Sequence, residues 1–188
     1  MLTTVSNFPK KQFQGETYEF LHLSPLQVSL PLDAAATNCI DLHVTFGCHC
    51  FTEKFEANVH LDHQRYTYKG EIRAFDLGRH ECSLQLPTVI QSMLKGRVYL
   101  ADESYTYVAQ ITIIDLAGSH SYSVFFALEK DSNVSVPALR MFVKSAYLKP
   151  LVAKTNGQSW RFVSLAGQVA GVFSPKEKKP RPQKKKTP

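Results

Sequence analysis

Three long alternating segments between residues 104 and 148 constrain the fold most. The segment "SYTYVAQITII" alternates apolar and polar side chains, and so do "SYSVFFAL" and "ALRMFVKSAYL" after it. Side chains alternate with a period of two in a β-strand, so each segment predicts a strand with one buried face. Short connections favour antiparallel pairing of neighbouring strands, so we expect a meander here.

Further strands are expected on both sides of this core. The segment "IDLHVTF" (40–46) places Ile40, Leu42, Val44 and Phe46 on one face. Weaker strand patterns cover "FEANVHLD" (55–62) and "YTYKGEIRAF" (66–75), with a turn or bulge at Gly70. We expect "SWRFVSLAG" (159–167) to be a last strand that closes the sheet.

One helix is predicted over "ECSLQLPTVIQSMLKG" (81–96). Its apolar residues recur at helical spacing: Leu86, Ile90, Met93 and Leu94. Ser83 is the expected N-cap, and Pro87 suits a first turn, where no N–H is needed. The predicted class is therefore α+β: an antiparallel sheet with one main helix packed on a face.

Composition divides the chain into three parts. Residues 1–37 contain closely spaced prolines and predict an irregular N-terminal segment, in which "LQVSLPL" is a candidate edge strand. Residues 38–174 form the predicted single α+β domain. Residues 175–188 hold four prolines and no large apolar side chain, which predicts a disordered basic tail.

The tail accounts for the whole net charge of +6, because it holds seven basic residues and one acidic residue. The rest of the chain is formally neutral, with 15 residues of each sign. Lys184, Lys185 and Lys186 are therefore candidate contacts to a nucleic-acid phosphate backbone. A purely solubilising tail explains the same composition.

The N-terminus "MLTTVSNFPKKQF" lacks the pattern of a secretory signal, and no run of eighteen apolar residues occurs. We therefore expect a cytoplasmic protein without membrane contact, whose four cysteines are reduced.

All four cysteines and five of the seven histidines lie between residues 39 and 82. Zinc binds such side chains, and Cys48 and Cys50 with His60 and His63 form one conceivable set. Their spacing does not match a zinc motif, and free cysteine often packs as a small apolar residue. We expect Cys48 and Cys50 to continue the apolar face of Phe46, with His49 on the other face. No metal or cofactor is therefore predicted, and a zinc-stabilised domain remains an alternative.

A second group of residues suggests chemistry on RNA. Arg79 and His80 precede the predicted helix, and Lys144 and Tyr147 lie on the last strand of the meander. These are residue types that serve as general acid, general base or phosphate-binding cation in metal-free RNA cleavage. Arg140 and Phe142 share a strand face with Lys144, where a basic and an aromatic side chain can hold a phosphate and stack a base.

The segments "FDLGRHECSLQLPTVIQSML", "YTYVAQITI", "YSVFFAL" and "FVKSAYL" resemble a bacterial family carried on phage-like and mobile elements, over about residues 40–150. More distantly, a helix followed by a meander ending in a small residue, Ala and Tyr is similar to the barnase–colicin–RelE group of RNA-cleaving toxins. That similarity implies ribonuclease activity, with Arg79 or His80 before the helix and Lys144, Ser145 and Tyr147 on the last strand. Those toxins are shorter and basic across their core, whereas this core is neutral.

We accordingly expect an RNA-directed protein of a mobile element, with metal-independent ribonuclease among its candidate activities. The alternative is a non-enzymatic module that binds a protein partner or nucleic acid. The sequence leaves open whether the protein is an enzyme, which substrate it takes and its oligomeric state.

Overall fold

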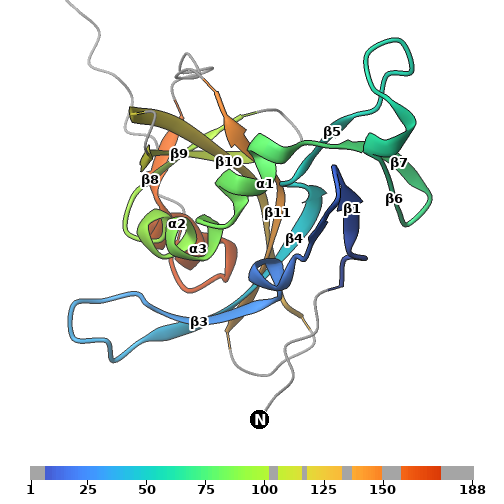
Figure 1. Ribbon diagram of the computed structural model, residues 1–188. Helices are drawn as coiled ribbons and strands as arrows, with labels where there is room; N and C mark the ends of the chain where they lie inside the picture. Colours follow the sequence, from blue (N-terminus) through green and yellow to red (C-terminus); the bar gives the residue numbers. More distant parts are fainter. Residues whose placement is uncertain (1–6, 102–105, 116–117, 133–136, 150–157, 175–188) are drawn as a thin grey trace, which may run out of the picture.

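The computed structural model describes residues 7–101, 106–115, 118–132, 137–149 and 158–174. It has a mixed α+β architecture in which a seven-stranded sheet curls into a half-barrel, with the strand order β12-β8-β9-β10-β11-β4-β3. Figure 1 shows the helices gathered on one side of this sheet. A three-stranded sheet, β5-β7-β6, and a two-stranded sheet, β1-β2, lie beside it.

The predicted meander forms the centre of the large sheet. Its strands are β9 (Tyr107–Asp115), β10 (Gly118–Lys130) and β11 (Ala138–Leu148), paired antiparallel in sequence order. The alternating pattern was therefore assigned correctly. The "ALRMFVKSAYL" segment coincides with β11.

The sheet is mixed rather than purely antiparallel, which corrects the predicted class in part. Strand β4 (Cys39–His49) pairs parallel to β11, and β3 (Leu26–Pro31) pairs antiparallel to β4 at the sheet edge. Alternation within a strand reveals which residues are buried but carries no information about strand direction. The parallel pair joins segments about a hundred residues apart in the chain, so no short turn fixes it.

The N-terminal segment contains more regular secondary structure than its closely spaced prolines indicated. Strands β1 (Lys11–Phe13) and β2 (Glu16–Tyr18) form a hairpin, and the 3-10 helix η1 covers Leu21–Leu23. The hairpin turn places Gln14 and Gly15 at positive φ, where glycine carries little strain. The predicted edge strand in "LQVSLPL" is confirmed as β3, and Pro31 ends it.

Three helices replace the one predicted. The expected helix is divided into α1 (Leu77–Ser83) and α2 (Leu86–Met93), so Ser83 ends α1 and does not cap α2. Asp76 caps α1 by accepting a hydrogen bond from the Arg79 N–H at 2.7 Å. Pro87 lies in the first turn of α2, as predicted.

One further strand prediction was wrong, and another was correct only in part. Residues 55–62 contain turns and the start of the 3-10 helix η2 (Asp62–Gln64), and no strand. The segment "SWRFVSLAG" is only partly strand: β12 covers Ser159–Arg161 and α3 covers Phe162–Val169. Its apolar residues fit helical spacing as well as alternation, which is a common ambiguity in short segments.

The remaining strands complete the two sheets. They are β5 (Thr52–Lys54), β6 (Arg65–Tyr68), β7 (Glu71–Phe75) and β8 (Arg97–Leu100). The turn expected at Gly70 is confirmed, with Gly70 at φ +81°. None of the helices in the described residues is long and apolar enough to span a membrane.

The core lies between the helices and the facing side of the curled sheet. Leu42, Val44, Leu139, Met141 and Val143 of the parallel pair are all fully buried or nearly so. A second, aromatic part of the core joins the N-terminal segment to the sheet, where the rings of Phe20 and Phe51 stack with centroids 3.9 Å apart. The alternate residues of β11 therefore remain on the opposite, solvent-facing side.

Candidate functional site

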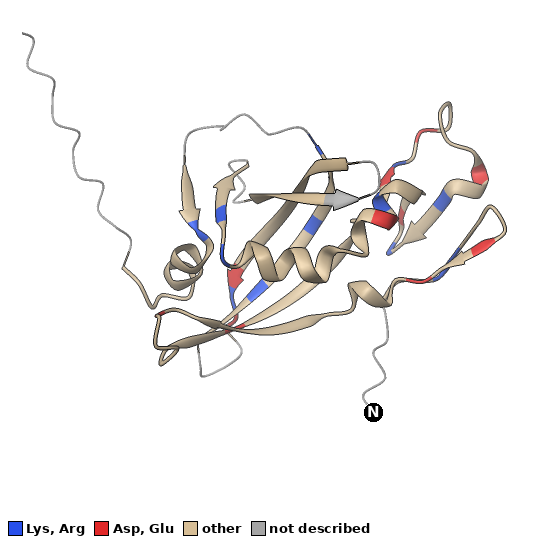
Figure 2. Ribbon diagram, turned by 60° about the vertical axis from the view of Figure 1, so that its left-hand side comes forward, with Lys and Arg blue, Asp and Glu red and all other residues tan. Residues whose placement is uncertain are grey.

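Five side chains on the solvent-facing side of β10 and β11 form what we call the β11 face: Phe125, Arg140, Phe142, Lys144 and Tyr147. The face exists because the buried residues of β11 alternate with exposed ones. Figure 2 shows Lys and Arg positions on the long strands of the main sheet, whereas acidic and basic positions mix in the three-stranded sheet.

Phe142 is the most conspicuous member of the face, because 45% of this large apolar residue is exposed. It lies between Arg140 and Lys144 along the strand. A cavity of about 370 Å³ is lined by all three residues together with Thr45, Ala127, Glu129 and Met141. Two cations and an exposed ring thus share one hollow of the sheet surface.

The charges of this face are only partly neutralised. The Arg140 guanidinium lies 3.8 Å from the Glu129 carboxylate, in an exposed ion pair that contributes little to stability. The Lys144 ammonium donates to the hydroxyl of Thr106 at 2.6 Å. A hydroxyl oxygen carries no net charge, so this bond orients the lysine and leaves its positive charge available.

The other end of the face is a stack of π systems. The rings of Phe125 and Tyr147 stack with centroids 5.5 Å apart, and the Arg79 guanidinium carbon lies 4.6 Å from the Tyr147 ring centroid. Arg79 Nη1 also donates to the carbonyl of Thr52 at 2.9 Å. Lys149 lies above Phe125 at 5.7 Å. These contacts hold the aromatic and basic side chains in fixed positions.

The four predicted catalytic residues are divided between separate places. Arg79 and Tyr147 line one cavity of about 360 Å³, which also includes Asp76 and Glu81. Lys144 lines the neighbouring hollow beside Phe142. His80 is only 7% exposed and packs against the rings of Tyr18, Phe20 and Phe75. The structure therefore brings Arg79 and Tyr147 together and places His80 in the aromatic core, while their catalytic roles stay a prediction.

Burial decides the chemistry of His80 and its neighbour His22. Removal from water lowers the pKa of both imidazoles, that of His22 to about 4, and the nearby His80 ring lowers the pKa of His22 further. No ring nitrogen of His80 has a hydrogen-bond partner at good geometry, although the Glu19 backbone opposes the pKa shift. His22 Nε2 lies 2.8 Å from the Ser83 hydroxyl. Both histidines are therefore neutral near pH 7, His80 in the core and His22 half-buried beside it.

The residues proposed for zinc are not assembled in the predicted way. Cys50 is fully buried, where desolvation raises the pKa of its thiol to about 12. His60 lies 2.8 Å from a Glu53 carboxylate oxygen, and His63 packs against Phe13. Within the described ranges, the set of Cys48 and Cys50 with His60 and His63 does not form a metal cluster. The prediction that Cys48 and Cys50 are buried is confirmed.

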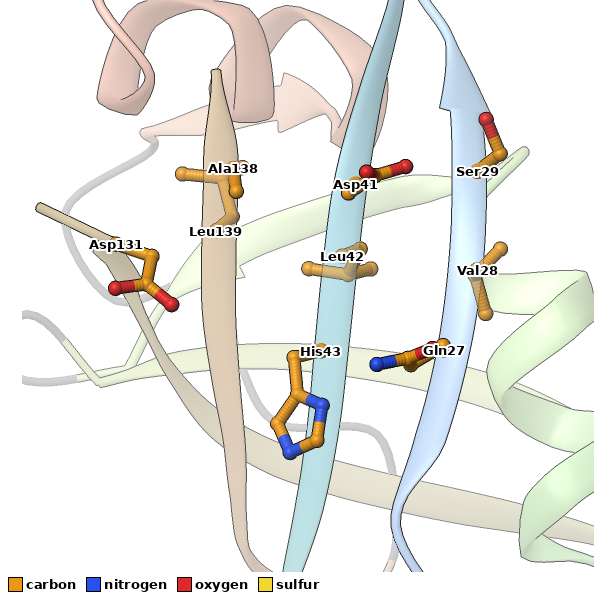
Figure 3. A pocket seen from close by; sticks show the side chains of 9 residues that line it. All are labelled: Gln27, Val28, Ser29, Asp41, Leu42, His43, Asp131, Ala138 and Leu139. Carbon is orange, nitrogen blue, oxygen red and sulfur yellow. The ribbon is translucent and has the colours of Figure 1, made fainter. Parts of the chain in front are cut away.

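A further cavity of about 330 Å³ lies on the solvent-facing side of the large sheet, at β3, β4 and β11 (Figure 3). Gln27 and His43 lie on neighbouring strands, and Asp41 stands further along β4. Asp131 approaches from the end of β10. Within the described residues, three ligand atoms lie close enough together to hold a metal ion only at Cys48, His49 and Glu71, and not among these polar groups. Sequence reasoning missed this hollow, because only the parallel pairing places Ala138 beside Asp41.

The family model of the YjaZ family matches residues 10–170, which is most of the chain. The chain belongs to the YjaZ family. The matched range contains the N-terminal hairpin, both larger sheets and the three helices that the structure describes. Curated proteins and solved structures give no match, and the similarity to RNA-cleaving toxins stays a sequence-based prediction. Lys184, Lys185 and Lys186 lie outside the described residues.

Proposed function

We propose that this protein binds single-stranded RNA on the β11 face. The observation that carries the proposal is the row of Arg140, Phe142 and Lys144 on one solvent-facing strand, with Phe142 45% exposed. Proteins that bind single strands combine cations for the phosphates with aromatic rings for the bases. The row offers both at the spacing of alternate residues in a strand.

The spacing along β11 suits a nucleic-acid strand. Alternate residues of a strand lie about 6–7 Å apart, which is close to the phosphate spacing of an extended single strand. A base stacked on Phe142 therefore leaves its flanking phosphates near Arg140 and Lys144. The stacked pair of Phe125 and Tyr147 offers a second aromatic surface further along.

The charge distribution supports a single strand over a duplex. Residues 1–174 are formally neutral, and a duplex-binding surface needs many cations across a wide area. The β11 face offers a narrow line of cations and rings instead. The basic residues of 175–188 supply additional, sequence-independent attraction for phosphate.

Binding without cleavage is the form of this proposal that the geometry supports best. His80 is the candidate acid–base, and its burial among aromatic rings keeps it away from a strand on the β11 face. Ribonuclease activity in a mobile-element protein remains the more specific prediction. It requires Arg79 and Tyr147, which share a cavity beside the face, to act without His80.

Fluorescence anisotropy of a labelled single-stranded uridine oligomer tests the proposal. We expect Phe142→Ala to weaken binding about 5- to 150-fold, because stacking of one base contributes about 1–3 kcal/mol. Ile72→Ala is the matched control, since Ile72 is 47% exposed but lies on β7. Equal affinity of wild type and Phe142→Ala would remove the β11 face as the binding site.

A further inference from the structure

Three potential metal ligands meet where the end of β4 approaches β7. One ligand atom each from Cys48, His49 and Glu71 can be chosen so that all three lie within 4.8 Å of one another. His49 Nε2 lies 3.1 Å from each oxygen of the Glu71 carboxylate. This is the only such group of Cys, His, Asp or Glu within the described part of the chain.

Two irregularities of the sheet bring these side chains together. Between β4 and β11, Phe46 pairs with Val143, and His49 pairs with Ser145. Two residues of β4, Gly47 and Cys48, therefore lie opposite the single residue Lys144 of β11. A regular strand would send Cys48 and His49 to opposite faces. The additional residue changes this alternation, and bulges commonly redirect side chains beside functional sites. The expectation that His49 faces away from Cys48 is thereby corrected.

The second irregularity lies on the neighbouring strand at the same level. Between β10 and β11, Phe126 pairs with Val143 and Phe125 with Ser145, which leaves Lys144 as the additional residue. Gly47 of β4 packs against this point, because a Cβ there would lie 2.9 Å from the Lys144 carbonyl oxygen. The two bulges therefore lie side by side on neighbouring strands, where the backbones of Gly47 and Lys144 are in close contact.

The three ligands line a cavity of about 460 Å³. The other residues of its wall are Phe46, Gly47, Tyr68, Lys69, Phe142 and Lys144. Glu71 is half exposed and His49 is more than one-third exposed, whereas Cys48 is buried. An ion held by these residues would therefore be reached through the cavity, with the thiol at its closed end.

Nearby cations set the charge balance of such a site. Arg73 Nη1 lies 3.3 Å from Glu71 Oε1, and Lys69 and Lys144 line the cavity. A divalent ion bound by one thiolate and one carboxylate forms a formally neutral centre. Binding releases the thiol proton of Cys48, and an imidazole that ligates a metal adds no charge. The nearby Lys69, Arg73 and Lys144 then lie beside a centre without net charge. With three neutral ligands, the centre would carry a charge of +2 and repel these side chains.

We propose that Cys48, His49 and Glu71 bind one Zn²⁺ ion and leave a fourth position open to the cavity. Thiolate sulfur, imidazole nitrogen and carboxylate oxygen are all zinc ligands, and zinc sites with three protein ligands keep an exchangeable position. The soft thiolate disfavours Mg²⁺ and Ca²⁺, which prefer oxygen ligands. The proposal does not rest on RNA binding, although the cavity shares Phe142 and Lys144 with the β11 face.

Competition with a chromophoric zinc chelator measures the affinity in the full-length, reduced protein. We expect one Zn²⁺ per chain, and about a tenfold or greater loss of affinity in Glu71→Gln and in His49→Ala. Co²⁺ in place of Zn²⁺ provides a second readout, because a cobalt–thiolate bond gives a charge-transfer band in the near ultraviolet. That band is expected to disappear in Cys48→Ser.

Two matched controls exist in the same fold. Glu53→Gln alters an equivalent histidine–carboxylate pair, His60 with Glu53, and Cys39→Ser removes an exposed thiol. Both are expected to bind Zn²⁺ as wild type does. The proposal is overturned if wild type binds less than one equivalent, or if the controls weaken binding as much as Glu71→Gln. Because Cys48 is buried, the partly exposed Glu71 provides the decisive variant, with circular dichroism to verify its fold.

Discussion

The guanidinium of Arg79 lies over the ring of Tyr147, with 4.6 Å between the guanidinium carbon and the ring centroid. This contact joins α1 to β11, two elements that are 55 residues or more apart in the chain. The same Arg79 donates to the carbonyls of Thr52 at 2.9 Å and His49 at 3.5 Å. It therefore connects the helix, the small sheet and the edge of the β11 face.

Arg79→Ala is expected to lower the free energy of unfolding by about 2 kcal/mol, because hydrogen bonds from a charged donor and a cation–π contact are lost together. Urea denaturation measures this change. Arg65→Ala is the control, since Arg65 lies at the same 4.6 Å above Phe55 but on an exposed surface. Its effect is expected to stay below about 1 kcal/mol. Equal losses in the two variants would contradict the connecting role of Arg79.

Gly47→Ala is expected to destabilise the fold by about 1–3 kcal/mol. The new Cβ would lie 2.9 Å from the Lys144 carbonyl oxygen and 3.1 Å from the Phe142 ring, so the stacked bulges would have to separate. Gly78→Ala is the contrasting change, because its Cβ meets only an Asp76 oxygen at 3.4 Å in the first turn of α1. There we expect a gain of about 0.5–1 kcal/mol from helix propensity. Thermal unfolding of both variants tests this difference in sign.

Stability is expected to fall as the pH drops below about 6.5, the usual pKa of histidine. Burial lowers the folded-state pKa of His22 to about 4 and lowers that of His80. The unfolded chain then binds protons that the folded chain does not, so acid favours unfolding. The loss from His22 continues to about pH 4 and then stops.

The variant His80→Phe separates this effect from the titration of carboxylates. An aromatic ring fits among Tyr18, Phe20 and Phe75 and takes up no proton. Urea midpoints measured from pH 7.5 to 4.5 are expected to fall less steeply in this variant than in wild type. If the urea midpoints of wild type and His80→Phe fall equally with pH, His80 is not the origin of the acid sensitivity.

Deletion of residues 175–188 tests how much of the RNA affinity comes from the tail. The truncated chain lacks seven basic residues, so the plot of log affinity against log salt is expected to have a smaller slope. Binding that depends on Phe142 is expected to persist at low salt. If the truncated chain retains no affinity, the tail alone binds RNA, and the β11 face does not.

The sequence predicted correctly those features that depend on residues close together in the chain, namely the positions of strands and their buried faces. Alternation assigned β11 over Ala138–Leu148 and the buried set of β4, because the period of two belongs to the strand itself. The same reasoning placed Phe142 and Arg140 on one exposed face. Where a short apolar segment fitted two periods, as at Phe162–Val169, a helix was mistaken for a strand.

The long-range arrangement was decided by tertiary packing. No local pattern predicts that β4 pairs parallel to β11, because the paired residues lie about a hundred positions apart. The sheet has bulges at Gly47 and Lys144, next to which Cys48 and His49 both lie near the carboxylate of Glu71. Burial of His80 follows from the packing of the N-terminal segment, whose rings surround it.

Residue patterns along the chain were thus sufficient to predict the strands of the meander and their buried faces, and the neutral charge of residues 1–174 follows from composition. Each of these properties is set by residues close together in the chain. The parallel pair, the stacked bulges and the surroundings of the candidate site residues within the described ranges came only from the tertiary structure. They depend on contacts between distant segments, and a strand's own alternation is the same whichever partner it meets.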